Sequence, residues 1–339
     1  MGLPAALAEL PIVVDGCALE AHTFTTPNFE RLTTVVALSG LGCVGRGEDV
    51  AYEPATQLEH RSTAPFAHTG RRTFAEWSAA LETMELFATE PENHASRDYR
   101  RWAYESALLD LGLRQAGTTL GALLGREPQP VRFCVSSGLG PEPWLAVDPA
   151  LEFKLDARAD WTADHIAHLH TLDRVRVVDI KAHYGDAWGL DPADAMTQLE
   201  LVAAGLPDVV IEDPPVDEAA RALLADHWHR VAFDAPIHAL ADILALPPTG
   251  WMNIKPSRFG TLARLLEAIE HCAGQGIRLY GGGQFELAVG RRQIQELAAL
   301  WYPDGPNDVA PGGYNAVAAE AGLPRSPLPA PTGAAGFGA

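Results

Sequence analysis

The spacing of hydrophobic and polar positions changes near residue 128, which divides the chain into two parts. Before that point, β-rich runs at 12–19, 32–38 and 43–48 are separated by polar or glycine turns, which predicts a three-stranded antiparallel meander. Apolar residues then recur at intervals of three and four over 73–86 and 98–115, as amphipathic helices require. We therefore predict an α+β domain over residues 1–128.

After residue 128 the pattern becomes strand, loop and helix, repeated. Short apolar strands are expected at 131–136, 152–157, 176–181, 209–212, 231–234, 251–255, 277–280 and 307–310. Helices are expected between most of them, at 163–172, 192–204, 262–273 and 288–300. Eight parallel strands with helical crossovers predict an α/β fold, a (β/α)-barrel of the TIM type, over residues 129–320. The first crossover, 138–150, is rich in proline and too short for a good helix, so we expect none there.

Length and composition agree with a barrel and a smaller companion domain. The chain has 339 residues, and a barrel takes roughly 200 to 250 of them. Hydrophobic residues make up 47% and charged residues 20%, which is typical of a folded protein. The segment 321–339 is rich in proline, glycine and alanine, and we expect it to pack on the first domain or to fray.

The net charge and the cysteine spacing limit which macromolecular partners and which cellular compartment we expect. A formal net charge of −19 argues against nucleic acid or an anionic membrane as a partner, because both need a basic face. The four cysteines have no C-x-x-C spacing and are expected to be free thiols in a reducing compartment. The N-terminus has no basic leader and no stretch approaches a membrane span, so we expect a cytoplasmic protein.

Acidic residues close three successive strands of the predicted barrel. Asp179, Glu212 and Asp234 each follow an apolar run, at the carboxyl end where barrel enzymes place their chemistry. Three carboxylates that converge would repel one another unless a hard cation lay between them, and such oxygen ligands suit Mg²⁺ or Mn²⁺. The alternative is that these residues are helix N-caps and turn residues.

The next strand ends in a lysine. Alternation places Asn253 and Lys255 on the same inward face of the strand. Burial and a nearby bound cation both disfavour an ammonium group, so Lys255 is a candidate general base. The alternative is a structural lysine in a salt bridge.

A glycine-rich motif at 39–45 superficially suggests a different chemistry. Residues 40–45 fit G-x-G-x-x-G and follow a strand, as in dinucleotide-binding proteins. No helix follows to receive a pyrophosphate, so we interpret the motif as a hairpin turn.

In this order, the strand-end motifs resemble the enolase superfamily, nearest its muconate-lactonizing and o-succinylbenzoate synthase branches. The motifs are Asp179, Ile-Glu-Asp-Pro at 211–214, Asp-Ala-Pro-Ile at 234–237 and Asn-Ile-Lys-Pro at 253–256, supported by 42–48, 104–114 and 281–286. The resemblance implies that residues 1–128 are a capping domain, that the three carboxylates bind Mg²⁺, and that Lys255 is a base or an acid. It also implies a homo-oligomer and a small carboxylate substrate, chosen by loops near 20–30 and 46–56.

Two positions depart from the pattern of those branches. Their second strand carries Lys-x-Lys, whereas here Lys154 is followed by Asp156. Their third strand carries an asparagine two residues after the metal-binding aspartate, and here that position is Lys181. Lys181 could be a second base, bind the substrate carboxylate or compete with the metal for Asp179, and an ion pair between Lys181 and Asp156 is equally open.

We expect substrate contacts from further residues around these positions. The candidates are Lys154, Asp156, His183, Tyr184, Asn253, Gln284 and Glu286. For Glu286, capping of the following helix is an equal alternative.

The sequence thus predicts a metal-dependent lyase or isomerase in which Lys255 moves the proton and Lys181 assists. A single lysine on one face of the substrate favours a syn elimination over a racemisation, which needs two bases. Two alternatives stay open: an aldolase-type barrel that forms a Schiff base, and a degenerate barrel that only binds its ligand.

Overall fold

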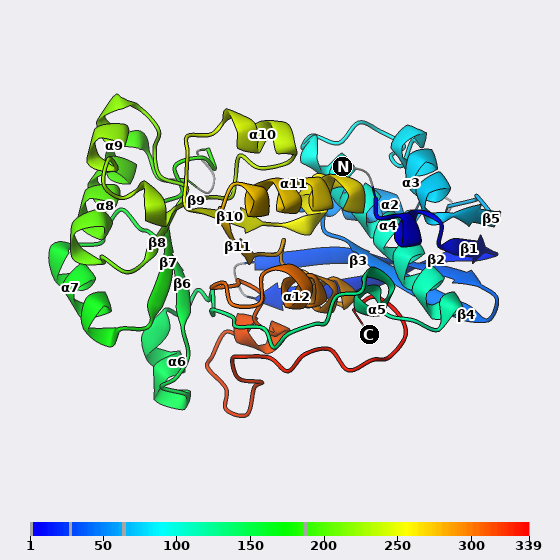
Figure 1. Cartoon of the computed structure of the whole chain (residues 1–339). Coiled ribbons are helices and arrows are strands. Elements are labelled where there is room, and N and C mark those ends of the chain that lie inside the picture. Colours follow the sequence, from blue (N-terminus) through cyan, green and yellow to red (C-terminus); the bar gives the residue numbers. More distant parts are fainter. Residues whose placement is uncertain (1–2, 27–28, 63–65, 186–188, 339) are drawn as a thin grey trace.

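The computed structural model describes residues 3–26, 29–62, 66–185 and 189–338. The N-terminal part of this chain lies beside a barrel, and the C-terminal tail returns from the barrel toward the N-terminal part (Figure 1). None of the described helices is long and apolar enough to cross a membrane.

The N-terminal part contains the predicted antiparallel meander. Its elements are α1 (Ala5–Ala8), β1 (Pro11–Val14), β2 (Gly16–Thr26), β3 (Phe29–Gly40), β4 (Cys43–Asp49), α2 (Pro54–Ser62), β5 (Gly70–Thr73), α3 (Phe74–Thr83), α4 (Ala95–Ala116) and α5 (Leu120–Leu124). The sheet order β2-β3-β4 confirms the meander, while β1 leaves it to pair with β5. The loop expected near 20–30 falls partly on residues 27 and 28, which lie outside the described residues, and on either side of them β2 continues to Thr26 and β3 begins at Phe29.

The glycine-rich motif is a hairpin whose glycines let a helix approach the sheet. β3 and β4 are joined at Leu41 and Gly42, both with positive φ, as the interpretation of a turn requires. A Cβ atom on Gly45 would lie 2.2 Å from the backbone nitrogen of Leu111 in α4, and one on Gly47 only 2.0 Å from a carbonyl oxygen of that helix. The glycines therefore seat the 22-residue helix α4 directly on β4.

The C-terminal part is built on one curled parallel sheet. Its strands are β6 (Phe153–Asp156), β7 (Val175–Asp179), β8 (Val210–Glu212), β9 (Val231–Phe233), β10 (Trp251–Ile254) and β11 (Arg278–Gly281), paired in chain order. Parallel bridges Val135–Phe153, Phe133–Asn307 and Gly282–Asp308 continue the ring at the two remaining strand positions. The sheet and these bridges match the predicted barrel, in which isolated bridges take the place of the first and last strands.

Helices cover the outside of this sheet (Figure 1). They are α6 (Pro141–Val147), α7 (Ala163–Leu172), α8 (Pro192–Gly205), α9 (Glu218–Leu223), α10 (Leu240–Ala245), α11 (Leu262–Gly274) and α12 (Val289–Trp301), with 3₁₀ turns at Trp228–Arg230, Pro256–Phe259 (η2) and Gly312–Asn315. The expectation of no helix in the first crossover is wrong. Proline at the first position of α6 pre-sets the backbone for a helix, and Trp144 is buried in the core.

The two parts and the tail are joined by buried polar contacts. Glu48 of β4 accepts hydrogen bonds from the backbone nitrogens of Leu287, Ala288 and Gly290, at the beginning of α12. In the tail, Phe337 is fully buried and its backbone nitrogen donates to Asp110 of α4. The barrel and the α4 side of the N-terminal part are thereby held in one arrangement.

Candidate active site

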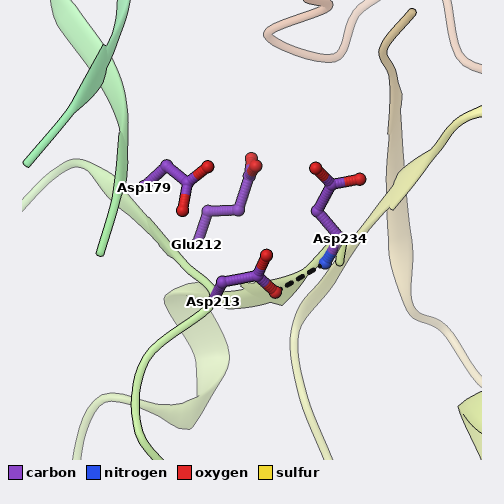
Figure 2. A group of neighbouring side chains, drawn as sticks. All are labelled: Asp179, Glu212, Asp213 and Asp234. Carbon is purple, nitrogen blue, oxygen red and sulfur yellow. Dashed lines mark hydrogen bonds between the residues drawn. The ribbon is translucent and has the colours of Figure 1, made fainter. Parts of the chain in front are cut away.

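Three acidic side chains from neighbouring strands meet at the carboxyl end of the sheet. Asp179 ends β7, Glu212 ends β8, and Asp234 directly follows β9. All three are fully buried. With Asp213, each offers an oxygen within 4.8 Å of the others. Figure 2 shows the four side chains gathered in one place.

Asp213 has a different task from the other three. Its carboxylate accepts a hydrogen bond from the backbone nitrogen of Asp234 at 2.8 Å, which is the dashed line in Figure 2. It also accepts one from the backbone nitrogen of Ala235 at 2.9 Å. Asp213 itself has a positive φ of 48°, and burial raises its pKa well above the usual range. It therefore holds the strand end that carries Asp234, and Asp179, Glu212 and Asp234 remain as the carboxylate trio.

The trio does not cap the helices that follow its strands. The N-cap of α8 is Asp191 and that of α9 is Asp217, and each accepts a hydrogen bond from the first turn of its helix. The capping alternative is therefore wrong for Asp179 and Glu212. Neither buried carboxylate is used at the beginning of a helix.

Each member of the trio is paired with its own lysine. Lys154 Nζ lies 2.5 Å from Glu212 Oε1. Lys181 Nζ lies 2.7 Å from Asp179 Oδ2, and Lys255 Nζ lies 2.7 Å from Asp234 Oδ2. The structure thus brings together the carboxylates and lysines that the sequence singled out.

The sequence carried a further signal for this pairing. Of the 25 basic residues in the chain, three are lysines and 22 are arginines, and the three lysines are these three. Arginine remains protonated in proteins, whereas a lysine can release its proton when its surroundings favour the neutral form. A chain that uses arginine everywhere else therefore keeps lysine only where the amine lies beside the trio.

Asp234 is contacted by three donor side chains. Besides Lys255, it accepts from Arg258 at Oδ1, at 2.9 Å, and from the hydroxyl of Tyr184 at Oδ2, at 2.6 Å. Burial acts to raise its pKa, but Arg258 and Lys255 outweigh burial and hold the pKa well below its usual range. Arg258 was not predicted from the sequence, although it lies in η2, three residues after Lys255.

Glu212 is held by neutral and charged donors. The hydroxyl of Tyr280 in β11 donates to Oε2, and the amide of Asn253 lies 3.4 Å from that oxygen. Burial, opposed by Lys154 and reinforced by the neighbouring carboxylates, raises the pKa of Glu212 to about 7. Tyr280 was also missed, because a tyrosine in a strand is an ordinary core residue.

Lys181 bridges two acids. Its ammonium lies 3.1 Å from Asp156 Oδ1 in addition to its contact with Asp179, and 4.3 Å from the ring centre of Tyr184. The parallel register places Asp156 beside Asp179, so the ion pair left open by the sequence is present. Burial lowers the pKa of Lys181, but Asp179 and Asp156 outweigh burial and raise it above the usual value.

Three of the expected substrate contacts are engaged elsewhere. His183 contacts the carbonyl oxygen of Pro214 at 2.9 Å. Gln284 accepts from Tyr52 and donates to Tyr99, both in the N-terminal part. Glu286 accepts from the backbone nitrogen of Gln284, and Glu48 takes the helix-capping role that was the alternative for Glu286.

The N-terminal part reaches the barrel through the loop after β11. Arg31 donates to the carbonyl oxygen of Gln284 at 2.8 Å, and it stacks on Tyr52 at 4.2 Å. Phe24 and Phe29, at the ends of β2 and β3, both contact the ring of Phe285. The described residues at the ends of β2 and β3 thus lie against this loop of the barrel.

The donor set fits a hard divalent cation. The trio offers carboxylate oxygens, which Mg²⁺ and Mn²⁺ prefer. Asp179 Oδ2 is buried and accepts no aligned hydrogen bond from any described residue, so it has electron pairs available for a cation. The buried acidic cluster could therefore bind a metal ion.

Comparison with protein families gives two adjoining matches. Residues 127–316 match the domain of unknown function DUF8230, C-terminal domain, and residues 5–123 match its N-terminal domain. No curated protein matches the chain in sequence.

Comparison with solved structures identifies the fold. Muconate lactonizing enzyme from Pseudomonas putida matches with a TM-score of 0.65 and 17% identity over 88% of each chain. A member of the enolase superfamily from Listeria innocua has a TM-score of 0.60 and 18% identity, over 89% of this chain and 85% of that one. An unknown member of that superfamily from Enterococcus faecalis has a TM-score of 0.61 and 21% identity, over 88% and 84%. The fold is that of the enolase superfamily and is similar to muconate lactonizing enzyme.

Proposed function

We propose that this chain, which belongs to the DUF8230 family, is a divalent-cation-dependent lyase or isomerase that removes a proton beside the carboxylate of a small acid. Its fold is similar to that of muconate lactonizing enzyme. The observation that carries the proposal is the matching of the chain's three lysines with the three carboxylates of the trio. A merely structural ion pair could use arginine equally well.

Asp179, Glu212 and Asp234 would hold Mg²⁺ or Mn²⁺. When bound, such a cation supplies stabilisation for the negative charge that develops on the substrate carboxylate as the proton leaves. The acidic surface gives an anionic substrate no attraction, so its carboxylate depends on this cation and on the local ammonium groups.

Lys255 is the proposed base. Arg258 also neutralises Asp234, so Lys255 can release its proton without leaving that buried carboxylate uncompensated. Lys181 is held protonated by two acids, which suits a cation that binds the substrate carboxylate more than a second base. This division supports chemistry by one amine on one face, as in a syn elimination.

The test is exchange of solvent deuterium into a panel of small carboxylic acids, measured by mass spectrometry with Mg²⁺ present. We expect exchange into at least one acid, and a loss of at least about 100-fold in Lys255→Ala. Lys255→Arg is the matched control, because it keeps a cation beside Asp234 but removes the base. Exchange that survives in both variants would exclude Lys255 as the base.

The Schiff-base alternative is separated in the same experiment. An aldolase-type reaction would proceed in chelator, and borohydride would trap the substrate on a lysine. The lysines are few enough for mass spectrometry to identify the modified one directly. Trapping without any exchange would replace the proposed proton transfer by that chemistry.

A further inference from the structure

Lys181 is the lysine of the site with a second acid within ion-pair distance. Its ammonium lies 2.7 Å from Asp179 Oδ2 and 3.1 Å from Asp156 Oδ1. Asp179 is fully buried, whereas the side chain of Asp156 is 55% exposed. A small rotation of the lysine side chain therefore exchanges a buried partner for one at the solvent edge.

Neither of the other two lysines has a second acid, among the described residues, as close as Asp156 is to Lys181. Lys154 is 3% exposed, and its second acid, Asp308, is 3.8 Å away. Lys255 is paired with Asp234, which it shares with Arg258. Among the described lysines, Lys181 is thus the one with two close acids.

The contact between Lys181 and Asp179 is one of charge without hydrogen-bond alignment. Asp179 Oδ1 accepts the backbone nitrogen of Lys181 at 2.9 Å, while Oδ2 is buried with no aligned donor among the described residues. An oxygen in this state loses little directional bonding when a metal ion replaces the ammonium. The ammonium lies 2.7 Å from Oδ2, at the position where a metal ion bound to this oxygen would compete with it.

Cationic side chains already lie against the trio. Asp179, Glu212 and Asp234 are contacted by four of them, Lys154, Lys181, Lys255 and Arg258. A divalent cation would add two positive charges to this set. Repulsion is relieved most easily if a resident cation moves away.

We propose that Lys181 is a movable counter-ion that competes with the divalent cation for Asp179 and moves to Asp156 when the cation binds. This inference rests on the proposed function, because it takes the trio to be the metal site. It assigns Asp156 the role of a positioning residue, which retains the ammonium at the edge of the site. Lys181 and Asp156, on neighbouring strands, then act together as a pair.

The first measurement is the affinity for Mg²⁺ by calorimetry on the full chain. Lys181→Met removes the competing charge and keeps the apolar stem, and should bind Mg²⁺ at least about tenfold more tightly than the natural chain. Lys181→Arg is the matched control, since it keeps a cation and should bind no more tightly. Equal affinity in Lys181→Met and the natural chain would overturn the proposal.

A second variant changes Asp156, the exposed partner of Lys181. Asp156→Asn should weaken Mg²⁺ binding about threefold, the scale of a half-exposed ion pair. In the Lys181→Met background the same change should have little effect, which separates a role through Lys181 from a general loss of negative charge. Asp160→Asn, an exposed acid paired with Arg158, is the control for that general effect. An equal effect of Asp156→Asn in both backgrounds would contradict the positioning role.

A third readout follows the ammonium itself. Labelling with [ε-¹³C]lysine gives only three ε-carbon signals, and that of Lys181 is identified by its absence from Lys181→Met. Saturation with Mg²⁺ should shift this signal, and an unmoved signal would overturn the movement. If neither the natural chain nor any variant binds Mg²⁺ at millimolar concentration, the metal site of the proposed function fails as well. If the natural chain binds Mg²⁺ and Lys181→Met binds it with the same affinity, only the inference about Lys181 is overturned, and the proposed metal site stands.

Discussion

The ammonium of Lys154 lies 2.5 Å from the carboxylate of Glu212, and both side chains are buried between the ends of β6 and β8. The two residues come from strands that are not neighbours, because β7 lies between them. A buried pair of this kind costs stability when one partner is removed alone.

Lys154→Met should therefore lower the free energy of unfolding by about 3 kcal/mol, because Glu212 loses its compensating charge in a buried site. Denaturation in urea measures this change. The double variant Lys154→Met with Glu212→Met should recover most of the loss, since both charges are gone. A double variant as unstable as the single one would show that packing, and not the ion pair, sets the cost.

Gly282→Ala should impair the site more than the fold. A Cβ atom there would lie 2.7 Å from Asn253 Oδ1 and 3.0 Å from Lys255 Cε, so the proposed base must shift. We expect proton exchange to fall about 100-fold, the scale of a misplaced catalytic group, with a stability loss of about 1 kcal/mol. Gly138→Ala is the control, because no atom lies within 4 Å of its added Cβ. Equal activity of the two variants would contradict the assigned position of Lys255.

Glu105 should make stability depend on pH away from the site. It is fully buried in α4, accepts hydrogen bonds from Ser78 and from the backbone nitrogen of Leu262, and burial raises its pKa to about 7. A raised carboxyl pKa favours the protonated native state, so this stability is complete below about pH 4.5 and is lost as pH rises through 7.

Glu105→Gln should remove that loss, which amounts to about 3 kcal/mol. The amide oxygen of Gln can accept from Leu262, and its amide nitrogen can donate to the Ser78 hydroxyl, which then accepts instead of donating. Unfolding in urea at pH 5 and pH 8 measures the difference between the variant and the natural chain. An identical pH dependence in both proteins would assign the titration to another group.

Removal of divalent cations should stop proton exchange. The trio would lose the charge that stabilises the product of proton removal, so EDTA should abolish exchange and added Mg²⁺ or Mn²⁺ should restore it. Na⁺ at equal ionic strength is the control for screening. Full exchange in EDTA would show that the ammonium groups of the chain suffice without a metal.

The sequence predicted the parts of the fold that depend on local patterns of residues. Alternation and helical spacing predicted the meander and eight strand positions, and α7 lies at 163–172 as expected. The failures occurred where long-range packing decides. Trp144, buried against the core, accompanies a short helix in a crossover that proline content alone predicted to be irregular.

The sequence by itself determined which carboxylates and lysines stand at the ends of successive strands, because strand periodicity fixes which way a side chain faces. Only the tertiary structure decided which lysine meets which acid, that Arg258 and Tyr184 share Asp234, and that Asp213 holds a turn. Those pairings depend on register and on side-chain reach between segments up to 58 residues apart. No local pattern carries that information.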